Sequence, residues 1–282
     1  RADEPALNTG RYALDQARQL VDKRNFSEAI KSYQRLVRAK PEDSDLLIEA
    51  ARVHGWSDRN KESAELYQRV IKRFPARRND VIAPLAAQLL WADRADAAIP
   101  LLQEALTRKP NDRDSAINLG EALQTTGKYP QAIAVYDELL TKNSNDAAAR
   151  RGKAWALLRS DRFADAEPLF RDILKSDPNN ADARIGLART LNFSGRHQDA
   201  IRAYDQLARD FPKDQGIQVQ RATAQYWADM EQKALSTLDT LITDEAETLR
   251  NKILRTVKPA LSAGVEYSKD KDDLKITRGR VS

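Results

Sequence analysis

Residues 181–214 read ADARIGLARTLNFSGRHQDAIRAYDQLARDFPKD, and this stretch holds two helical patterns separated by a turn at Gly195. Its closing proline, Pro212, has counterparts along the chain. A proline, or a serine in its place, stands every 34 or 35 residues, at Pro41, Pro75, Pro110, Ser144, Pro178 and Pro212. Because each period has room for two helices and a turn, the sequence predicts an all-α protein built by stacking repeated helix pairs.

The repeats keep the same residue sizes at the same places. Seven copies, the first and last weaker, start at Gly10, Ser44, Asn79, Arg113, Ala147, Ala181 and Gln215. The eighth position is small in every copy, as Ala17, Ala51, Ala86, Gly120, Ala154, Ala188 and Ala222. The twentieth position is Ala29, Ser63, Ala98, Ala132, Ala166, Ala200 and Ala234, and the twenty-fourth is Tyr33, Tyr67, Leu102, Tyr136, Phe170, Tyr204 and Leu238. Small residues let the first helix of a pair (helix A) approach the second (helix B), and the large residue fills the space between neighbouring pairs.

The ends of the predicted helices carry matching signals. The turn inside each pair falls at residues that tolerate a left-handed backbone, namely Asp58, Asp93, Gly127, Asp161, Gly195 and Asp229. Two residues after the recurring proline stands an Asp or Asn that can cap the next helix A, at Asp43, Asp112, Asp146, Asn180 and Asp214. One junction, residues 76–80, holds an extra residue, and there we expect Asn79 or Asp80 to be the cap.

These seven in-phase copies resemble the tetratricopeptide repeat family over residues 10–248. The resemblance implies a right-handed superhelical solenoid of about seven helix-turn-helix units. We expect residues 1–9 to form an N-terminal tail and residues 249–258 to form a helix that covers the last apolar face. Pro259 is predicted to end helical structure.

Residues 259–282 change pattern, because apolar and polar residues alternate there as in a strand. We predict a short C-terminal β-hairpin whose turn spans residues 268–273. A lone hairpin is marginally stable in water. The segment is therefore predicted to be either the start of a truncated β-barrel or a piece of an ordinary soluble domain.

The composition argues against several classes of function. Without cysteine the chain has no disulfide, no thiolate metal site and no cysteine nucleophile, and either an oxidising compartment or the cytosol is compatible with that. The net charge of +5 comes from residues 249–282, which hold nine Lys or Arg and four Asp or Glu, whereas the rest of the chain holds 38 of each. A neutral solenoid lacks the basic stripe that nucleic acid would need, and no run of 18 apolar residues is present to span a membrane as a helix.

Aromatic residues gather on one predicted face of helix A. In the tetratricopeptide family, positions 2, 5, 9, 12 and 13 of helix A line the concave groove where ligands usually lie. Position 13 holds an aromatic ring in four copies and position 9 in one, so that all four tryptophans of the chain fall on this stripe. Arginines on the same stripe could bind hydroxyls or carboxylates. We predict a ligand-binding groove formed by Trp56, Trp91, Trp155, Phe193, Trp227, Arg52, Arg159 and Arg189.

Three interpretations of this stripe stay open. The rings could simply pack against the turn of an adjacent unit, and the arginines could be ordinary surface residues. Alternatively, Trp56 and Trp91 lie on helices that we expect about 8–10 Å apart, so their rings could stack on alternate sugars of a β-linked chain. Peptide capture is the third use. The Lys and Asn clamp by which some family members hold acidic peptides is absent, since position 5 is Ile48, Ala83, Ile117, Arg151, Ile185 and Val219.

Nothing in the sequence predicts catalysis. His54 falls on an interior position and is predicted to be a core histidine with its hydrogen bonds satisfied, and His197 stands at the start of a helix B. Neither has a recognisable nucleophile near it in the pattern, and there is no glycine-rich phosphate loop and no metal-ligand spacing. We therefore expect no enzyme activity, no cofactor and no metal.

A second resemblance concerns the turns and the C-terminal alternation. Turns of the type Trp56-Ser57-Asp58-Arg59, Trp91-Ala92-Asp93-Arg94 and Phe193-Ser194-Gly195-Arg196, followed by alternating strands, look like bacterial outer-membrane exporters of exopolysaccharide. That class implies a non-catalytic periplasmic scaffold that binds synthase or secretion components, or the nascent polysaccharide, and couples them to an outer-membrane barrel. The alternative is a soluble scaffold, cytoplasmic in that case, that binds peptides or assembly partners and has no role with polysaccharide.

Overall fold

The computed structural model describes residues 4–261, 267–270 and 273–276. Over these residues the chain forms fifteen α-helices, one short 3-10 helix and two short strands. The first pairs are α1 (Glu4–Asp22) with α2 (Phe26–Ala39), α3 (Ser44–Trp56) with α4 (Asn60–Arg73), α5 (Arg78–Trp91) with α6 (Ala95–Arg108), and α7 (Arg113–Thr125) with α8 (Tyr129–Lys142). The later pairs are α9 (Ala147–Arg159) with α10 (Phe163–Ser176), α11 (Ala181–Phe193) with α12 (His197–Asp210), and α13 (Gln215–Trp227) with α14 (Glu231–Leu238), followed by α15 (Asp244–Leu261).

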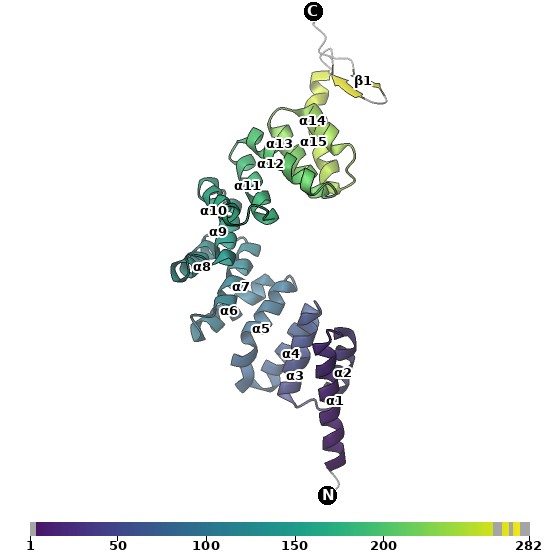
Figure 1. Ribbon diagram of the computed structural model, residues 1–282, viewed down its shortest axis with the longest axis vertical. Helices are drawn as coiled ribbons and strands as arrows, with labels where there is room; N and C mark the ends of the chain where they lie inside the picture. The colour runs from purple at the N-terminus through teal and green to yellow at the C-terminus, as the bar shows by residue number, and fades with distance from the viewer. Residues whose placement is uncertain (1–3, 262–266, 271–272, 277–282) are drawn as a thin grey trace, which may run out of the picture. The chain divides into compact units, whose positions relative to one another are not determined.

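The chain divides into two compact units, residues 1–152 and 153–282, with the boundary inside α9. In the first unit every helix from α1 to α8 packs against the next one along the chain. In the second unit the helices from α10 to α15 do the same, and Figure 1 shows neighbouring helices lying side by side within each unit. The prediction of an all-helical repeat array is therefore confirmed.

The core of each unit is built from the repeat positions that the sequence singles out. Every alanine at the eighth and twentieth positions is completely buried. Ser63, the one exception at the twentieth position, is also buried, and its hydroxyl donates to the Ala51 carbonyl oxygen at 2.7 Å. The large residue at the twenty-fourth position is at most 2 % exposed in every copy. Small residues thus bring the two helices of a pair together, and one large side chain fills the space beside them.

The turn inside each pair follows the predicted chemistry. Asp58, Asp93, Asp161 and Asp229 have φ between 57° and 59°, and Gly127 and Gly195 have φ of 73° and 82°. Arg24 adopts the same conformation in the first pair, with φ of 54°. A single left-handed residue ends helix A in each pair, and aspartate adopts this conformation more readily than most residues other than glycine.

The predicted caps of helix A are confirmed at five junctions. Each cap side chain accepts a hydrogen bond from the backbone N–H three residues later, at 3.0 to 3.2 Å, and the caps are Asp43, Asp112, Asp146, Asn180 and Asp214. The prediction for the junction with the extra residue is wrong. There a 3-10 turn, η1 (Pro75–Arg77), absorbs the extra residue, and α5 begins at Arg78. Asn79 and Asp80 consequently lie inside the helix, where Asp80 accepts a hydrogen bond from Arg77 at 2.6 Å.

The two ends of the chain differ from the sequence prediction. At the N-terminal end α1 begins at Glu4, so residues 4–9 are helical and not part of a tail. At the other end α15 is longer than the predicted cap and includes Pro259. An interior proline also occurs in α5, α6 and α10, at Pro84, Pro100 and Pro168. Proline removes one backbone donor, and packing along the rest of the helix outweighs that cost.

The two strands are short. β1 (Tyr267–Asp270) and β2 (Asp273–Ile276) pair antiparallel, with Tyr267 opposite Ile276. They use residues that the sequence predicts as the turn, while Leu261, predicted to lie in the first strand, belongs to α15. The rest of the predicted hairpin, residues 262–266, 271–272 and 277–282, lies outside the described residues. This short ladder does not support the hairpin predicted over residues 259–282, and the start of a β-barrel stays a prediction.

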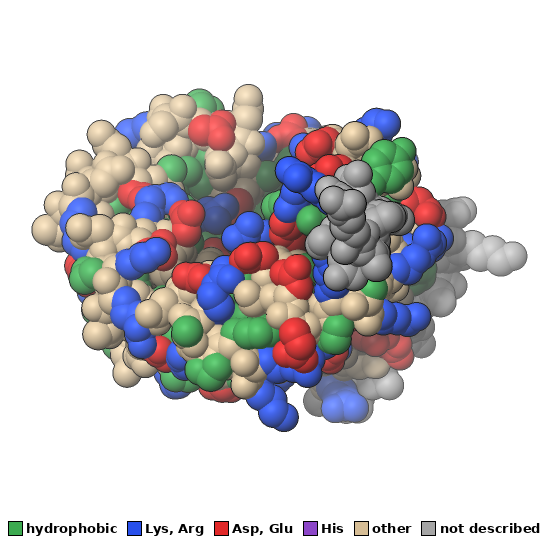
Figure 2. Space-filling model, turned by 90° about the horizontal axis from the view of Figure 1, so that it is seen from below, with side chains coloured by type: hydrophobic (Ala, Val, Ile, Leu, Met, Phe, Trp, Pro, Cys, Tyr) green, Lys and Arg blue, Asp and Glu red, His purple; other side chains and the backbone are tan. Residues whose placement is uncertain are grey.

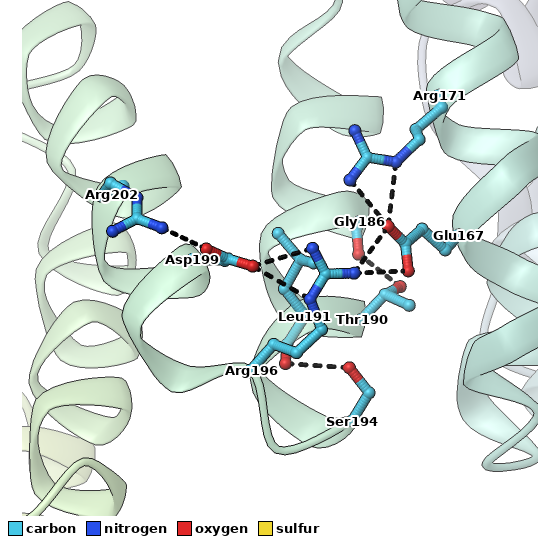
Figure 3. A network of polar contacts seen from close by, with 9 residues as sticks. All are labelled: Glu167, Arg171, Gly186, Thr190, Leu191, Ser194, Arg196, Asp199 and Arg202. Atoms are coloured by element: carbon cyan, nitrogen blue, oxygen red, sulfur yellow. Dashed lines mark hydrogen bonds and ion pairs between the residues drawn. The ribbon is translucent and has the colours of Figure 1, made fainter.

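An ion-pair network joins three elements of the second unit, as Figure 3 shows. Arg196, at the turn between α11 and α12, donates to both carboxylate oxygens of Glu167 on α10 at 3.0 and 3.1 Å. The same guanidinium holds Asp199 on α12 at 2.8 and 2.9 Å. Arg171 and Arg202 complete the network as further partners of Glu167 and Asp199. The arginine of the Phe193-Ser194-Gly195-Arg196 turn thus connects neighbouring helix pairs.

Candidate functional site

The aromatic residues at position 13 end helix A in their pairs. Trp56 is the last residue of α3, Trp91 of α5, Phe193 of α11 and Trp227 of α13. The side chains of Trp56, Trp91 and Phe193 are 58 %, 54 % and 48 % exposed, and Trp227 is half-buried. Single exposed apolar side chains are normal on a soluble protein, but these three large rings occupy the same position of their repeats. Position 13 therefore presents accessible rings beside the turns at three places, two in the first unit and one in the second.

In the second unit these rings also touch one another. Phe193 stacks on Phe163 with ring centres 6.0 Å apart and planes 16° apart, and it lies 5.5 Å from Trp227. Trp227 in turn meets His197 at 5.8 Å. Because Phe163 and His197 are the first residues of α10 and α12, each position-13 ring packs on the start of helix B in the preceding pair. The packing interpretation therefore describes this unit.

The first unit differs. The side-chain amide of Asn60, at the start of α4, donates to the Trp91 backbone oxygen at 3.3 Å and leaves the indole uncovered. Among the described residues, neither Trp56 nor Trp91 has a ring-to-ring contact. These two indoles are the most exposed tryptophans of the chain and lie one repeat apart.

Three predicted site residues come together at Trp155. Its indole N–H donates to the Asp182 carboxylate at 2.8 Å, and its ring meets Phe170 edge-on at 5.4 Å. The guanidinium carbons of Arg159 and Arg189 lie 6.0 and 5.9 Å from the ring centre. Two cations beside one indole give favourable cation–π contacts, and together with the Asp182 carboxylate they form a charged rim of both signs around an apolar surface.

Arg52, the remaining predicted residue, lies in the first unit. It is exposed on α3 near the buried Tyr67 phenol. Burial raises the pKa of Tyr67, and the nearby Arg52 guanidinium opposes that rise. Arg52 and Trp56 are four residues apart on one helix, so their side chains share a face.

Sequence reasoning missed a polar cluster around Arg18, the residue at position 9 of the first copy. Arg18 on α1 binds both oxygens of Glu49 on α3, at 3.1 and 2.5 Å, and the Tyr33 hydroxyl donates to the same carboxylate at 2.9 Å. The Arg18 hydrogen bonds hold the pKa of Glu49 below its usual range. The signal that could have found it is an arginine at position 9, a tyrosine at position 24 and a glutamate at position 6 of the next copy.

The charges of the surface are mixed. On the face that Figure 2 presents, Lys and Arg side chains are interspersed with Asp and Glu, and no broad patch of one sign is visible on the described residues there. In the described part of the chain, His, Asp and Glu side chains do not gather in groups of three that could hold a metal ion. No helix among the described residues is both long and apolar enough to cross a membrane.

The two histidines differ in their hydrogen bonds. His197 Nδ1 lies 2.9 Å from the Asn192 side-chain oxygen. His54 is 5 % exposed, and its Nδ1 has no hydrogen-bond partner among the described residues, so the prediction of a satisfied core histidine is wrong in its polar detail. Helix pairing fixes the position of a residue, but it does not supply a partner for each ring nitrogen.

Burial lowers the pKa of His54 below its ordinary value of about 6.5, so the folded state binds fewer protons there than the unfolded chain. As the pH falls from 7 to 5.5 through the unfolded value, protonation favours unfolding, and we expect the free energy of unfolding to decrease. Urea unfolding at several pH values measures this decrease. The His54→Leu variant should give a flatter profile over the same range, and an equal slope in both proteins would contradict the prediction.

Paired antiparallel helices with small-to-large packing and accessible residues along helix A define a helical-repeat protein of the scaffold type. Models of the tetratricopeptide repeat match residues 14–78, 89–156 and 157–226. Because these segments cover well over half of the chain, it belongs to the tetratricopeptide repeat family. No curated protein matches the sequence.

Solved structures show the same fold. A tetratricopeptide repeat protein from Parabacteroides merdae ATCC 43184 is similar over 88 % of this chain and 99 % of its own, with a TM-score of 0.71 and 14 % identity. PilW, a widely conserved type IV pilus biogenesis factor, is similar over 74 % and 97 %, with a TM-score of 0.61 and 16 % identity. YrrB, a tetratricopeptide protein with an unusual peptide-binding site, is similar over 65 % and 96 %, with a TM-score of 0.54 and 16 % identity.

Proposed function

We propose that this chain is a non-catalytic scaffold that binds other polypeptides along the exposed stripe of its A helices. Proteins of this repeat family serve as protein–protein interaction scaffolds. The observation that carries the proposal is the exposure of Trp56 and Trp91, each by more than half of its side chain. An exposed indole buries a large apolar area when a partner covers it, so tryptophan is a frequent anchor of protein interfaces.

The positions of the arginines support the same use. Arg52 and Trp56 lie one helical turn apart on α3, and Arg159 and Arg189 flank Trp155 in the second unit. A rigid apolar surface beside a guanidinium suits a polypeptide, which offers apolar side chains next to carbonyl and carboxylate oxygens. YrrB, which shares the fold, is described as having a peptide-binding site.

The Trp56→Ala/Trp91→Ala double variant tests the proposal on an array of 12-residue peptides. We expect each peptide that the wild-type protein binds to lose at least tenfold in affinity, about 1.4 kcal/mol, because the loss of two anchors removes apolar contact. The helical circular dichroism spectrum should be unchanged, since both rings are largely exposed in the free protein. Ile242→Ala removes an apolar side chain that is 89 % exposed outside the stripe, and it should keep full affinity. Unfolding of the double variant would show that the rings are packing residues.

A second candidate function rests on the same two rings. We infer a link to exopolysaccharide export, with the chain in the periplasm beside an outer-membrane barrel, from the turn motifs and from Trp56 and Trp91 as stacking surfaces for sugars. Binding of cellohexaose or chitohexaose to the wild-type protein, and its loss in the double variant, would support this role. Peptide binding without any oligosaccharide binding would contradict the export role. A gene that encodes a helical or enzymatic region after Ser282, in place of alternating strands, would contradict it as well.

A further inference from the structure

A filled carboxylate site in the first unit can serve as a template. Arg18 on α1 and Tyr33 on α2 together make three hydrogen bonds to Glu49 on α3, between 2.5 and 3.1 Å. Tyr33 is 2 % exposed, and the Glu49 side chain is 25 % exposed. A bidentate guanidinium and a phenol hydroxyl therefore bind one glutamate at the edge of the core, which is strong charge-assisted recognition.

The same arginine and tyrosine recur without the glutamate. Arg52 and Tyr67, and Arg189 and Tyr204, show the spacing of Arg18 and Tyr33. The position that corresponds to Glu49 is held by Pro84 after the first of these pairs and by Gln220 after the second.

The second-unit pair leaves buried polar atoms without partners. Tyr204 is completely buried, and neither its hydroxyl nor Arg189 Nε makes a hydrogen bond of normal geometry among the described residues. Burial raises the pKa of Tyr204, and the Arg189 guanidinium, which lies beside the phenol, opposes that rise. A buried polar group left in this way loses its hydration without a hydrogen bond to replace it, which destabilises the folded state. Asp182, on the same helix as Arg189, is already hydrogen-bonded to the Trp155 indole. Arg189 itself lies 5.9 Å from the Trp155 ring, so an apolar wall stands next to the donors.

We propose that Arg189 and Tyr204 form a receptor for a glutamate side chain of a bound partner polypeptide. The inference rests on the proposed scaffold function and names the chemical class that the second unit recognises. A glutamate would supply an acceptor to the Tyr204 hydroxyl and to Arg189 Nε, in the way that Glu49 does for Tyr33 and Arg18. The half-buried indole of Trp155 would cover the methylene groups of the same side chain.

The Gln220→Glu variant tests the receptor within the protein itself. By analogy with Glu49, the new carboxylate should reach Arg189 and Tyr204 and raise the melting temperature by about 2–4 °C at pH 7. The gain should vanish in Arg189→Gln/Gln220→Glu. Arg209→Gln, at an exposed arginine of α12, is the control and should leave the gain intact. A Gln220→Glu protein no more stable than wild type would overturn the proposal.

Binding is tested by titrating the protein with N-acetyl-glutamate N-methylamide. The readout is the position of the arginine side-chain Nε–H signals in ¹⁵N NMR spectra. We expect a saturable shift of the Arg189 signal at low millimolar concentration, about tenfold weaker in Tyr204→Phe and absent in Gln220→Glu. The glutamine analogue should give no shift, and an equal shift would overturn the proposal. Tighter binding of N-acetyl-glycine or of glucuronate would do so as well, by assigning the site to a chain terminus or a sugar acid. Peptide affinity at Trp56 and Trp91, which lie in the first unit, is measured separately in the intact protein. Failure of the glutamate receptor is therefore distinguishable from failure of the scaffold function.

Discussion

Gly186→Ala should lower the free energy of unfolding by about 1–3 kcal/mol, although alanine is the better helix former by about 1 kcal/mol. Gly186 lies inside α11 against the completely buried ring of Phe170. A Cβ at Gly186 would stand 2.2 Å from Phe170 Cε1 and 2.4 Å from Cζ. Such distances cannot occur, and a rigid aromatic ring in a filled core has little room to move away.

Urea unfolding followed by circular dichroism measures the Gly186→Ala effect, and a second substitution assigns its cause. Phe170→Leu removes ring atoms, so the double variant Phe170→Leu/Gly186→Ala should lose less than the sum of the single losses. Strict additivity, or a Gly186→Ala protein more stable than wild type, would mean that the ring does not confine this glycine.

Asp146→Ala is expected to lower the free energy of unfolding by about 2 kcal/mol, because this carboxylate both caps a helix and binds an arginine. Asp146 caps α9 by accepting from the Ala149 N–H at 3.0 Å, and a cap contributes about 1 kcal/mol. It also accepts two hydrogen bonds from Arg113 on α7, at 2.6 and 2.9 Å, with its side chain only 2 % exposed. Arg113 is half-exposed, so water recovers part of its hydration and the total stays below that of a fully buried pair.

The matched control for Asp146→Ala is Asp43→Ala. Asp43 caps α3 through the Leu46 N–H at 3.0 Å and has no arginine partner among the described residues. Asp43→Ala should lower the free energy of unfolding by about 1 kcal/mol, and equal decreases for the two variants would contradict the double role of Asp146. Arg113 holds the pKa of Asp146 below its usual value, so this contribution is complete above about pH 4 and disappears as the pH falls further.

Much of the candidate site follows from the sequence, since repeat phase alone placed the tryptophans and arginines on helix A. The position of a residue within the repeat does not predict that Phe193 and Trp227 contact neighbouring rings while Trp56 and Trp91 do not. For Trp91 the first residue of helix B in the preceding pair is Asn60, which has no ring, whereas for Trp56 it is Phe26, so residue type at that position does not by itself decide whether two rings meet. The Glu49 cluster was missed because its three members come from three different helices.

The sequence by itself determined the repeat, the turns and the caps, because small residues, left-handed aspartates and N-cap carboxylates act within a few residues of where they stand. Only the tertiary structure decided how the ends behave and which polar groups are satisfied. α15 continues through Pro259, and η1 absorbs the extra residue near Arg77, because packing over a whole helix outweighs one local signal. The Tyr204 hydroxyl and Arg189 Nε lack a hydrogen bond of normal geometry for a related reason: such a bond needs the right atom on a neighbouring helix, and repeat spacing does not specify that atom.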